Sequence, residues 1–515
     1  MNGATLNTMK VAVALAAAMA ATVLASPSPA AARQAGDLNR FHQQRLHWKA
    51  CTLGPGDQVG KDLDEAGARC ADVTVPLDYS RPDGRTIKIA ISRLKASGEE
   101  PRLGMMLLNG GGPAPAIDMP PYMRRLMGAA GPRYDLVGMD PRSLGRSAGV
   151  DCGWGVGTWI KGAGTTRHSF EQSARFAKDL ADRCARTDRG LLPHISTRNI
   201  ARDMDIVRGA LGERKMSYNG ASYGTYLGGV YATMFPGRLE RVVLDSSMDP
   251  YTWGPRLISA AVDVNEEALA AWAGWAAERD GEYGLGATEA EVVKLVHRIL
   301  AVSAKRPLEI GPYRLDATLV PTLMIDNLGT DEEPARASLA ESVRVMREAA
   351  AGRFAEPTPD LAAELAFLTA ATPEDASVGS GQASIICGDV AAPRDPAVYW
   401  RDVQRHRRAA PMFGPVGYNI GPCAYWPTRP AEPPTMIKAD LPALMVAATG
   451  DTRTTYRSNQ LLHGLLRGSR MITLDAYVHA PYQRGYPNAC INDRVEDYLL
   501  TGRLPTGDLT CAPEK

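Results

Sequence analysis

The sequence predicts an α/β fold in which a mostly parallel sheet, flanked by helices, carries a large and mainly helical insertion. Short apolar strands alternate with helical segments between residues 104 and 247, and this alternation implies parallel strands joined by crossover helices. From residue 260 to residue 438 the apolar residues have helical spacing instead. Strand patterns return near residue 441, so the second part of the sheet follows the insertion.

Four segments follow from these patterns. They are a signal peptide at residues 1–32, the first part of the core at 33–259, a helical lid at 260–438 and the second part of the core at 439–515. A chain of 515 residues is longer than one compact core usually needs. An inserted lid over the carboxyl edge of the sheet accounts for the extra length, and the proline-rich stretch PTRPAEPPTM is the predicted linker back to the core.

The N-terminus has the features of a secretory signal peptide. Lys10 precedes an apolar run of small residues at positions 11–24, and residues 30–32 give an A-x-A cleavage pattern. The run is short for a membrane span, although a retained N-terminal anchor is the alternative. We therefore expect a secreted, extracellular protein with no membrane contact once the signal peptide is removed.

The eight cysteines indicate disulfides, because an even number in an exported protein favours disulfides over free thiols. They fall into four couples that are close in sequence, and the predicted pairs are Cys51–Cys70, Cys152–Cys184, Cys387–Cys423 and Cys490–Cys511. The chain has no C-x-x-C and no H-x-x-x-H spacing, so no metal site is expected. A net charge of +1 gives no sign of a nucleic-acid partner, and the oligomeric state is left open.

The first part of the core begins with a predicted antiparallel hairpin at the edge of the sheet. Its strands, residues 73–79 and 86–94, alternate apolar and polar residues around the turn RPDG. The elements predicted after it are strands at 104–108 and 134–139, a helix at 200–211, a strand from residue 215, a helix up to residue 235 and a strand at 239–247.

The lid and the second part of the core contain the remaining predicted elements. Apolar spacing predicts lid helices at 264–279, 290–304, 332–351 and 361–371, with almost no strand signal. The second part of the core is predicted to contain strands at 443–448 and 471–474, with a helix at 456–466 between them.

A possible nucleophile lies between a predicted strand and a predicted helix. Ser222 is the central residue of Gly220-Ala221-Ser222-Tyr223-Gly224, and G-x-S-x-G in this context is the nucleophile-elbow pattern, in which a strained turn exposes the serine hydroxyl. A second G-x-S-x-G is centred on Ser147, but neither a strand nor a helix flanks it. We therefore predict that Ser222 is the nucleophile.

An acid and a base follow the two strands of the second part of the core. Asp451 comes three residues after the end of strand 443–448, and His479 comes five residues after the end of strand 471–474. The order Ser, Asp, His is that of the α/β-hydrolases, and all three lie in loops at one edge of the sheet. Asp245, at the end of another strand, is the rival acid. The predicted oxyanion donors are the backbone N–H groups of Tyr223 and of Gly112 in the glycine-rich loop.

Several blocks of the chain resemble those of a known family. The blocks are WKAC…CADVTVPLDYSRP, NGGGP, DPRSLGRS, GASYGTYLGGVYATMFPGRLERVVLDSSMDP, ICGD, CAYWP and the GD…VH ending. In the same order they resemble those of the secreted bacterial tripeptidyl aminopeptidases, α/β-hydrolases akin to the proline iminopeptidases with a characteristic C-terminal segment. The resemblance spans nearly the whole mature chain. It implies an exopeptidase that releases short peptides, typically tripeptides, from a free N-terminus and needs no metal or cofactor.

Some positions depart from the pattern of that family. Ala114 and Pro115 replace glycines of the oxyanion loop, Ser143 replaces another glycine, and Val478 and Ala480 flank the histidine where the family has glycines. The three triad positions are unchanged. A stiffer and bulkier rim at residues 114–115 is expected to narrow the choice of peptide or to suit a different acyl group.

An aminopeptidase must also bind a charged amine, which calls for a carboxylate in a partly desolvated pocket. Asp389, in the ICGD block, is the candidate, and a helix or turn cap is its alternative role. The leading hypothesis is a secreted serine exopeptidase acting through a Ser-His-Asp acyl-enzyme mechanism on peptides. The alternatives are an esterase, lactonase or amidase acting on a small metabolite, and a binding protein without activity.

Overall fold

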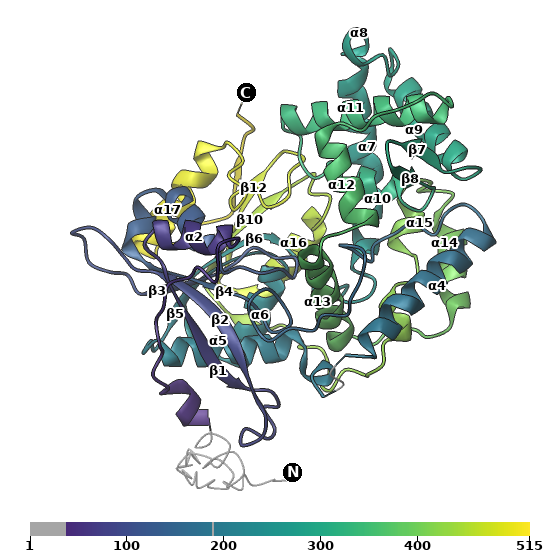
Figure 1. Ribbon diagram of the computed structural model, residues 1–515. Coiled ribbons are helices and arrows are strands. Elements are labelled where there is room, and N and C mark those ends of the chain that lie inside the picture. Colours follow the sequence, from purple (N-terminus) through teal and green to yellow (C-terminus); the bar gives the residue numbers. More distant parts are fainter. Residues whose placement is uncertain (1–37, 188–189, 515) are drawn as a thin grey trace, which may run out of the picture.

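A computed structural model describes residues 38–187 and 190–514 of the chain (Figure 1). The predicted signal peptide, residues 1–32, lies outside the described residues. Within the described part, no helix is long and apolar enough to cross a lipid bilayer.

One sheet of nine strands organises the described residues, in the spatial order β1-β2-β4-β3-β5-β6-β10-β12-β13. The pairs β1–β2 and β2–β4 are antiparallel, and every other neighbouring pair is parallel. The strands are β1 (Arg69–Pro76), β2 (Thr86–Leu94), β3 (Met105–Asn109), β4 (Asp135–Met139), β5 (Met216–Ser222), β6 (Leu239–Ser247), β10 (Ala443–Ala448), β12 (Arg470–Leu474) and β13 (Leu509–Cys511). The predicted α/β fold with a mostly parallel sheet is therefore confirmed.

Helices cover both faces of this sheet. Every residue of β3 and of β10 is buried, as expected of parallel strands that are covered on both sides. Alternate residues of β3 belong to different hydrophobic clusters: Met105 packs in the cluster with α5 (Thr197–Ala210) and α6 (Tyr223–Met234), and Met106 in the cluster with α3 (Met119–Leu126) and α17 (Ala489–Thr501).

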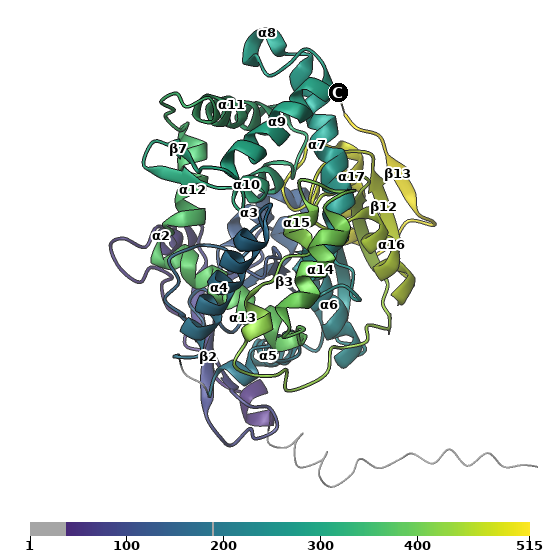
Figure 2. The ribbon, with the colours of Figure 1, turned by 90° about the vertical axis from the view of Figure 1, so that its right-hand side faces the viewer.

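The chain between β6 and β10 contains a third hydrophobic cluster, whose buried residues run from Val262 to Phe413. In both Figure 1 and Figure 2, α8 and α11 lie at the top of the molecule and α5 lies toward the bottom. The helices of this segment are α7 (Val262–Ala277), α8 (Asp280–Tyr283), α9 (Glu289–Ser303), α10 (Val320–Asn327), α11 (Glu333–Ala350), α12 (Pro359–Thr369), α13 (Pro373–Asp389), α14 (Pro396–His406) and α15 (Gly414–Gly417). The limits of the lid at residues 260 and 438 stay a prediction.

The predicted lid helices correspond to α7, α9, α11 and α12, with ends that differ by at most two residues. Other elements were missed. They are α2 (Gln58–Glu65), α3, α4 (Arg167–Cys184), α8, α10, α13, α14, α15, α17, the strand β13, the hairpin β7 (Leu308–Ile310) with β8 (Tyr313–Leu315), and the short pair β9 (Ala439–Asp440) with β11 (Leu466–Arg467). The predicted helix at 456–466 is α16 (Tyr456–Leu465).

Helix α13 was missed because its sequence favours other structures. It contains Gly379 and Gly381, and glycine lowers helix propensity by about 1 kcal/mol per residue. The packing requires both: a Cβ would come within 2.4 Å of Gly157 O at Gly379, and within 2.4 Å of Ser143 O at Gly381. Close contact with other backbone segments therefore stabilises a helix that local propensity disfavours.

Four disulfides join the cysteines of the described residues in sequence-local pairs, which are the pairs that the spacing predicts. The Cα–Cα distances are 4.9 Å for Cys51–Cys70, 4.5 Å for Cys152–Cys184, 5.0 Å for Cys387–Cys423 and 5.8 Å for Cys490–Cys511. These distances lie within the range that a disulfide bridges without backbone movement.

A fully buried ion pair ties the loop after β4 to α5. Both side chains are shielded from solvent, and Arg142 donates from Nε to Asp203 Oδ2 at 2.7 Å and from Nη2 to Oδ1 at 2.6 Å. The Tyr79 hydroxyl donates to the same carboxylate at 2.7 Å. This bidentate arrangement satisfies both buried charges.

Replacing Asp203 with asparagine is expected to lower the free energy of unfolding by about 3–5 kcal/mol, because the Arg142 guanidinium would remain buried without a counter-charge. Asp182→Asn is the matched control, since the Lys178–Asp182 pair is exposed and such pairs contribute about 0–1 kcal/mol. Denaturant or thermal unfolding of both variants measures the difference. Equal, small losses in the two variants would contradict the importance of the buried pair.

Candidate active site

Ser222 lies at the turn between β5 and α6. Its backbone has φ 53° and ψ −121°, a conformation that a non-glycine residue adopts only when its surroundings enforce it. The two glycines of the motif allow close packing around it. A Cβ at Gly220 would come within 2.5 Å of the Tyr218 ring, and one at Gly224 within 2.8 Å of Asn109 O. The G-x-S-x-G pattern here therefore reflects a sharp turn against neighbouring backbone.

Ser147, in the second copy of the motif, has a different environment. Its hydroxyl accepts a hydrogen bond from Ala90 N at 2.9 Å and donates to Asp140 O at 2.6 Å. No strand or helix of the described chain includes Ser147. The first hydrogen bond fastens the loop to β2 and the second ties it to the residue after β4, which is a structural role.

The structure brings the predicted acid and base together. His479 Nδ1 lies 3.0 Å from each carboxylate oxygen of Asp451. The carboxylate also accepts hydrogen bonds from the backbone N–H groups of Arg453 and Thr454 and from the Thr454 hydroxyl, at 2.7–3.0 Å. Burial alone would raise the pKa of Asp451, but His479 and these donors hold the pKa below its ordinary value. Asp451 is therefore ionised and can orient the imidazole.

The rival acid, Asp245, has another partner. Its Oδ2 accepts a hydrogen bond from Gln483 N at 2.8 Å, and within the described residues its Oδ1 has no partner. Burial raises the pKa of Asp245 to about 8, and the nearby charge of Asp451 acts in the same direction. Among the described contacts none joins Asp245 to His479, so the geometry favours Asp451 as the acid.

Ser222 and His479 open into the same cavity, whose volume is about 230 Å³. Gly110 and Gly112 of the glycine-rich loop also line it. The apolar lining residues are Trp159, Ile160, Met248, Trp253, Leu257, Ile258, Ala261, Ile325 and Ile386, and the polar ones are Asp326, Gln382, Thr452, Arg453 and Arg484. Several of these come from the segment between β6 and β10, so this segment forms part of the cavity wall.

The glycine-rich loop approaches Ser222 closely. Gly111 has φ +96°, and a Cβ there would lie 2.7 Å from Ser222 Cβ. The N–H of Gly111 donates to Asn109 Oδ1 at 3.0 Å, which fixes the loop. The next residue, Gly112, has φ +99° and lines the cavity. A side chain at Gly111 would not fit against the elbow, and one at Gly112 would clash with Ala114 of the same loop.

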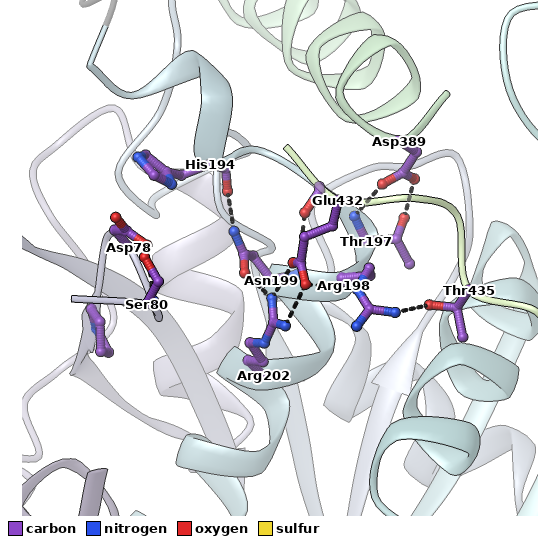
Figure 3. Close-up of polar contacts among 12 residues, drawn as sticks. Asp78, Ser80, His194, Thr197, Arg198, Asn199, Arg202, Asp389, Glu432 and Thr435 are labelled. Atoms are coloured by element: carbon purple, nitrogen blue, oxygen red, sulfur yellow. Dashed lines mark hydrogen bonds and ion pairs between the residues drawn. The ribbon is translucent and has the colours of Figure 1, made fainter. Parts of the chain in front are cut away.

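Asp389 is not among the residues that line this cavity. Its carboxylate accepts hydrogen bonds from Thr197 N at 2.7 Å, from the Thr197 hydroxyl and from Trp253 Nε1 at 2.9 Å (Figure 3 shows the contacts with Thr197). Burial raises its pKa to about 6, although these donors act in the opposite direction. Two donors from Thr197 at the first turn of α5 and a third from Trp253 favour the cap over the amine-binding role.

Sequence reasoning missed three charged residues of the cavity, Asp326, Arg453 and Arg484. Arg453 and Arg484 follow the predicted acid and base by two and five residues, so a search of the residues next to the triad would have found them. Asp326 lies on α10, in a run of apolar residues that carries no motif. In the described part of the chain, no group of three or more His, Cys, Asp or Glu side chains could hold a metal ion.

Comparisons with known proteins agree with this geometry. A family model described as "TAP-like protein" matches residues 410–511. A tripeptidyl aminopeptidase from Streptomyces lividans is 33% identical over 470 residues, covering 86% of this chain and 84% of the relative. Serine protease Hip1 from Mycobacterium tuberculosis is 27% identical over 513 residues, with 91% of each chain covered.

A further relative carries a different name. Carboxylesterase B from Mycobacterium tuberculosis is 32% identical over 502 residues, covering 90% of each chain. This relative and the one from Streptomyces lividans each exceed 30% identity and are matched over more than four fifths of their length. On these matches and the observed fold, the chain is a serine hydrolase of the peptidase type with an α/β-hydrolase fold, and it belongs to the tripeptidyl aminopeptidase family.

Proposed function

We propose that the protein is a secreted exopeptidase that releases short peptides, most simply tripeptides, from free N-termini through an acyl-enzyme. One observation carries the proposal: Ser222, on a strained elbow, shares a cavity of about 230 Å³ with His479, whose imidazole is held by the buried Asp451. The signal-peptide pattern and the four disulfides support secretion.

Each triad residue has a role that follows from proton transfer. His479 takes the proton of the Ser222 hydroxyl as the oxygen attacks the scissile carbonyl, and it then gives that proton to the leaving amine. Asp451 holds Nδ1 of the imidazole and stabilises the imidazolium. The backbone N–H groups of Tyr223 and Gly112 stabilise the oxyanion. Water then hydrolyses the acyl-enzyme with the same histidine as base.

The shape of the cavity supports an exopeptidase. Its lining includes Ser222 and, from the segment between β6 and β10, residues 257, 258, 261, 325, 326 and 386. A wall from this segment would limit how far a peptide extends on one side of Ser222, while the rest of the substrate continues on the other side. The number of residues released is therefore set by the distance between Ser222 and the wall formed by this segment.

We assign the recognition of the substrate amine to Asp326. Among the described residues that line the cavity it is the one carboxylate. Its side chain is 45% exposed, and Arg453 Nη2 lies 3.4 Å from its Oδ1. A carboxylate at a cavity wall can pair with an ammonium group that is partly desolvated on binding.

The test compares a tripeptide anilide that has a free N-terminus with its N-acetylated form. The enzyme is expected to cleave the free form. Its kcat/KM for the acetylated form should be at least about 100-fold lower, because acetylation removes a charge-assisted contact. Asp326→Asn should raise KM for the free substrate and leave KM for the acetylated one unchanged. Equal cleavage of both substrates by the unaltered enzyme would contradict an aminopeptidase.

A second candidate is an esterase that acts on a small acyl substrate. The similarity to a relative named carboxylesterase B and the apolar majority of the cavity lining favour it, since one triad serves any acyl transfer. Hydrolysis of p-nitrophenyl esters without cleavage of tripeptide anilides by the mature protein would establish this function instead.

A further inference from the structure

A chain of buried hydrogen bonds connects Asp389 to the residue that follows the nucleophile. The Thr197 hydroxyl donates to Asp389 Oδ2, and Thr197 Oγ1 lies 3.0 Å from the Tyr223 hydroxyl. The backbone N–H of Thr197 donates to Asp389 Oδ1 at 2.7 Å. Figure 3 shows Asp389, at the end of α13, above Thr197 at the start of α5. The helices α5 and α6 and the distant helix α13 therefore meet beside Ser222.

Trp253 holds the same tyrosine from another direction. Its Nε1 donates to Asp389 Oδ2 at 2.9 Å. The centroid of its ring lies 5.0 Å from that of Tyr223 and 5.0 Å from that of Tyr226 on the next turn of α6. Trp253 also lines the catalytic cavity. One carboxylate thus fixes both the hydroxyl that binds Tyr223 and the ring that packs on it.

The C-terminal end of α13 packs so closely against the start of α5 that its position is fixed. A Cβ at Gly388 would lie 2.0 Å from the carbonyl oxygen of Ile195, which precedes α5, so backbone contact holds Asp389 against the start of that helix. The disulfide of Cys387 with Cys423 fastens the same end of α13. The apolar residues Ala383, Ile385 and Ile386 of this helix pack in the hydrophobic cluster that also contains residues of α5 and α6. The carboxylate therefore occupies a fixed position relative to the elbow.

We infer that Asp389 is a positioning residue for catalysis, which acts through Thr197 and Trp253 to hold Tyr223. The backbone N–H of Tyr223 is one of the two oxyanion donors in the proposed function, and the inference rests on that assignment. A fixed side chain at Tyr223 fixes the adjoining peptide, and Ser222 can then keep its positive φ. Oxyanion donors contribute fully only when they are held in place before the reaction.

The test uses variants that remove one hydrogen bond at a time. Thr197→Val removes the Thr197 hydroxyl while keeping the shape of the side chain, and Thr197→Ser keeps the hydroxyl. Asp389→Asn weakens the hydrogen-bond acceptor. Tyr223→Phe removes the hydroxyl at the other end of the hydrogen-bond chain. Arg202→Gln is the matched control, because Arg202 lies on the same helix but bonds Glu432 at 2.6 and 2.8 Å (Figure 3), away from the elbow. The active sites of each variant are counted by end-point labelling with a fluorophosphonate. The value of kcat for a tripeptide anilide is then given per labelled site, together with KM.

Thr197→Val, Asp389→Asn and Tyr223→Phe are expected to lower kcat by about 10- to 100-fold with KM changed less than about 3-fold, because a displaced oxyanion donor acts in the transition state. Thr197→Ser should restore kcat to within about 3-fold, and the control should retain it. The double variant of Thr197→Val with Tyr223→Phe should lose no more than either single variant, since both break one chain.

The inference is overturned if Thr197→Val and Asp389→Asn lower the melting temperature but leave kcat per labelled site unchanged. A purely structural cap gives that result. If the unaltered enzyme is labelled at Ser222 but cleaves no tripeptide anilide, the proposed specificity fails, and the rate of phosphonylation in the same variants tests Asp389 instead. If Ser222 is not labelled at all, both proposals fail.

Discussion

Replacing Ser222 with alanine is expected to lower kcat by about 10⁴- to 10⁶-fold on every acyl substrate, since the oxyanion donors and the cavity alone retain little of the rate enhancement. The fold should persist, because alanine keeps the Cβ that the neighbouring glycines accommodate. Steady-state hydrolysis, fluorophosphonate labelling and a thermal melt measure the three expectations. Turnover above about one hundredth of the original rate would exclude Ser222 as the nucleophile.

Ser147→Ala is the matched control, because it changes the same residue type in the second copy of the motif. Its hydroxyl makes two buried hydrogen bonds, to Ala90 N and Asp140 O. Their loss is expected to cost about 1–3 kcal/mol of stability, with kcat per labelled site unchanged. Loss of labelling in Ser147→Ala and its retention in Ser222→Ala would reverse the assignment of the two serines.

The sequence was sufficient for the elbow because local geometry determines it. A turn with Ser222 at φ 53° requires small neighbours on both sides. The required glycines lie two residues before and two residues after the serine, so a short sequence motif reveals the turn. The contact between Asp451 and His479 was predictable for a related reason, since each residue follows a buried strand whose end is fixed by the order of the sheet. Structural features that are determined by residues close in sequence can therefore be predicted from the sequence.

The cavity wall could not be predicted in this way. Asp326 and Gln382 reach the cavity from α10 and α13, which approach the elbow only through packing between distant segments. The role of Asp389 is of the same kind, because its ICGD block gives no indication that Thr197 and Trp253 are its partners. Such contacts join residues more than 100 positions apart, and no local pattern encodes them.

Two departures from the family pattern have a structural meaning. Ser143 has φ 75° and Ala480 has φ 56°, so both adopt the left-handed backbone that glycine adopts without strain. Each is held by hydrogen bonds: Ser143 N donates to Ala148 O at 3.0 Å, and Ala480 N donates to Ser246 Oγ at 2.8 Å. The backbone conformation therefore explains the glycines at these positions in the family pattern, and the side chains present here stiffen the loop after β4 and the turn at His479.

Asp451→Asn is expected to lower kcat by about 10³- to 10⁴-fold with little change in KM, because an amide favours the wrong imidazole tautomer and cannot stabilise the imidazolium. In the native site both Asp451 oxygens lie 3.0 Å from His479 Nδ1. An asparagine would direct one N–H toward that nitrogen. Measuring kcat between pH 6 and pH 9 separates this loss from a shifted pH optimum.

Asp245→Asn is the control, since Asp245 is the other buried acid at the end of a strand near His479. Its pKa is raised by burial to about 8, so at neutral pH it is protonated and resembles an amide. Because the folded state keeps this proton from about pH 4 to pH 8 and the unfolded state releases it, the free energy of unfolding falls as pH rises, by up to ~1.4 kcal/mol per pH unit. Asp245→Asn should remove this decrease in the free energy of unfolding, and thermal melts of both proteins at several pH values measure it. The variant should also keep kcat at pH 7 within a few-fold of the value for the unaltered enzyme. A large loss of kcat in Asp245→Asn, with Asp451→Asn still active, would transfer the role of the acid to Asp245.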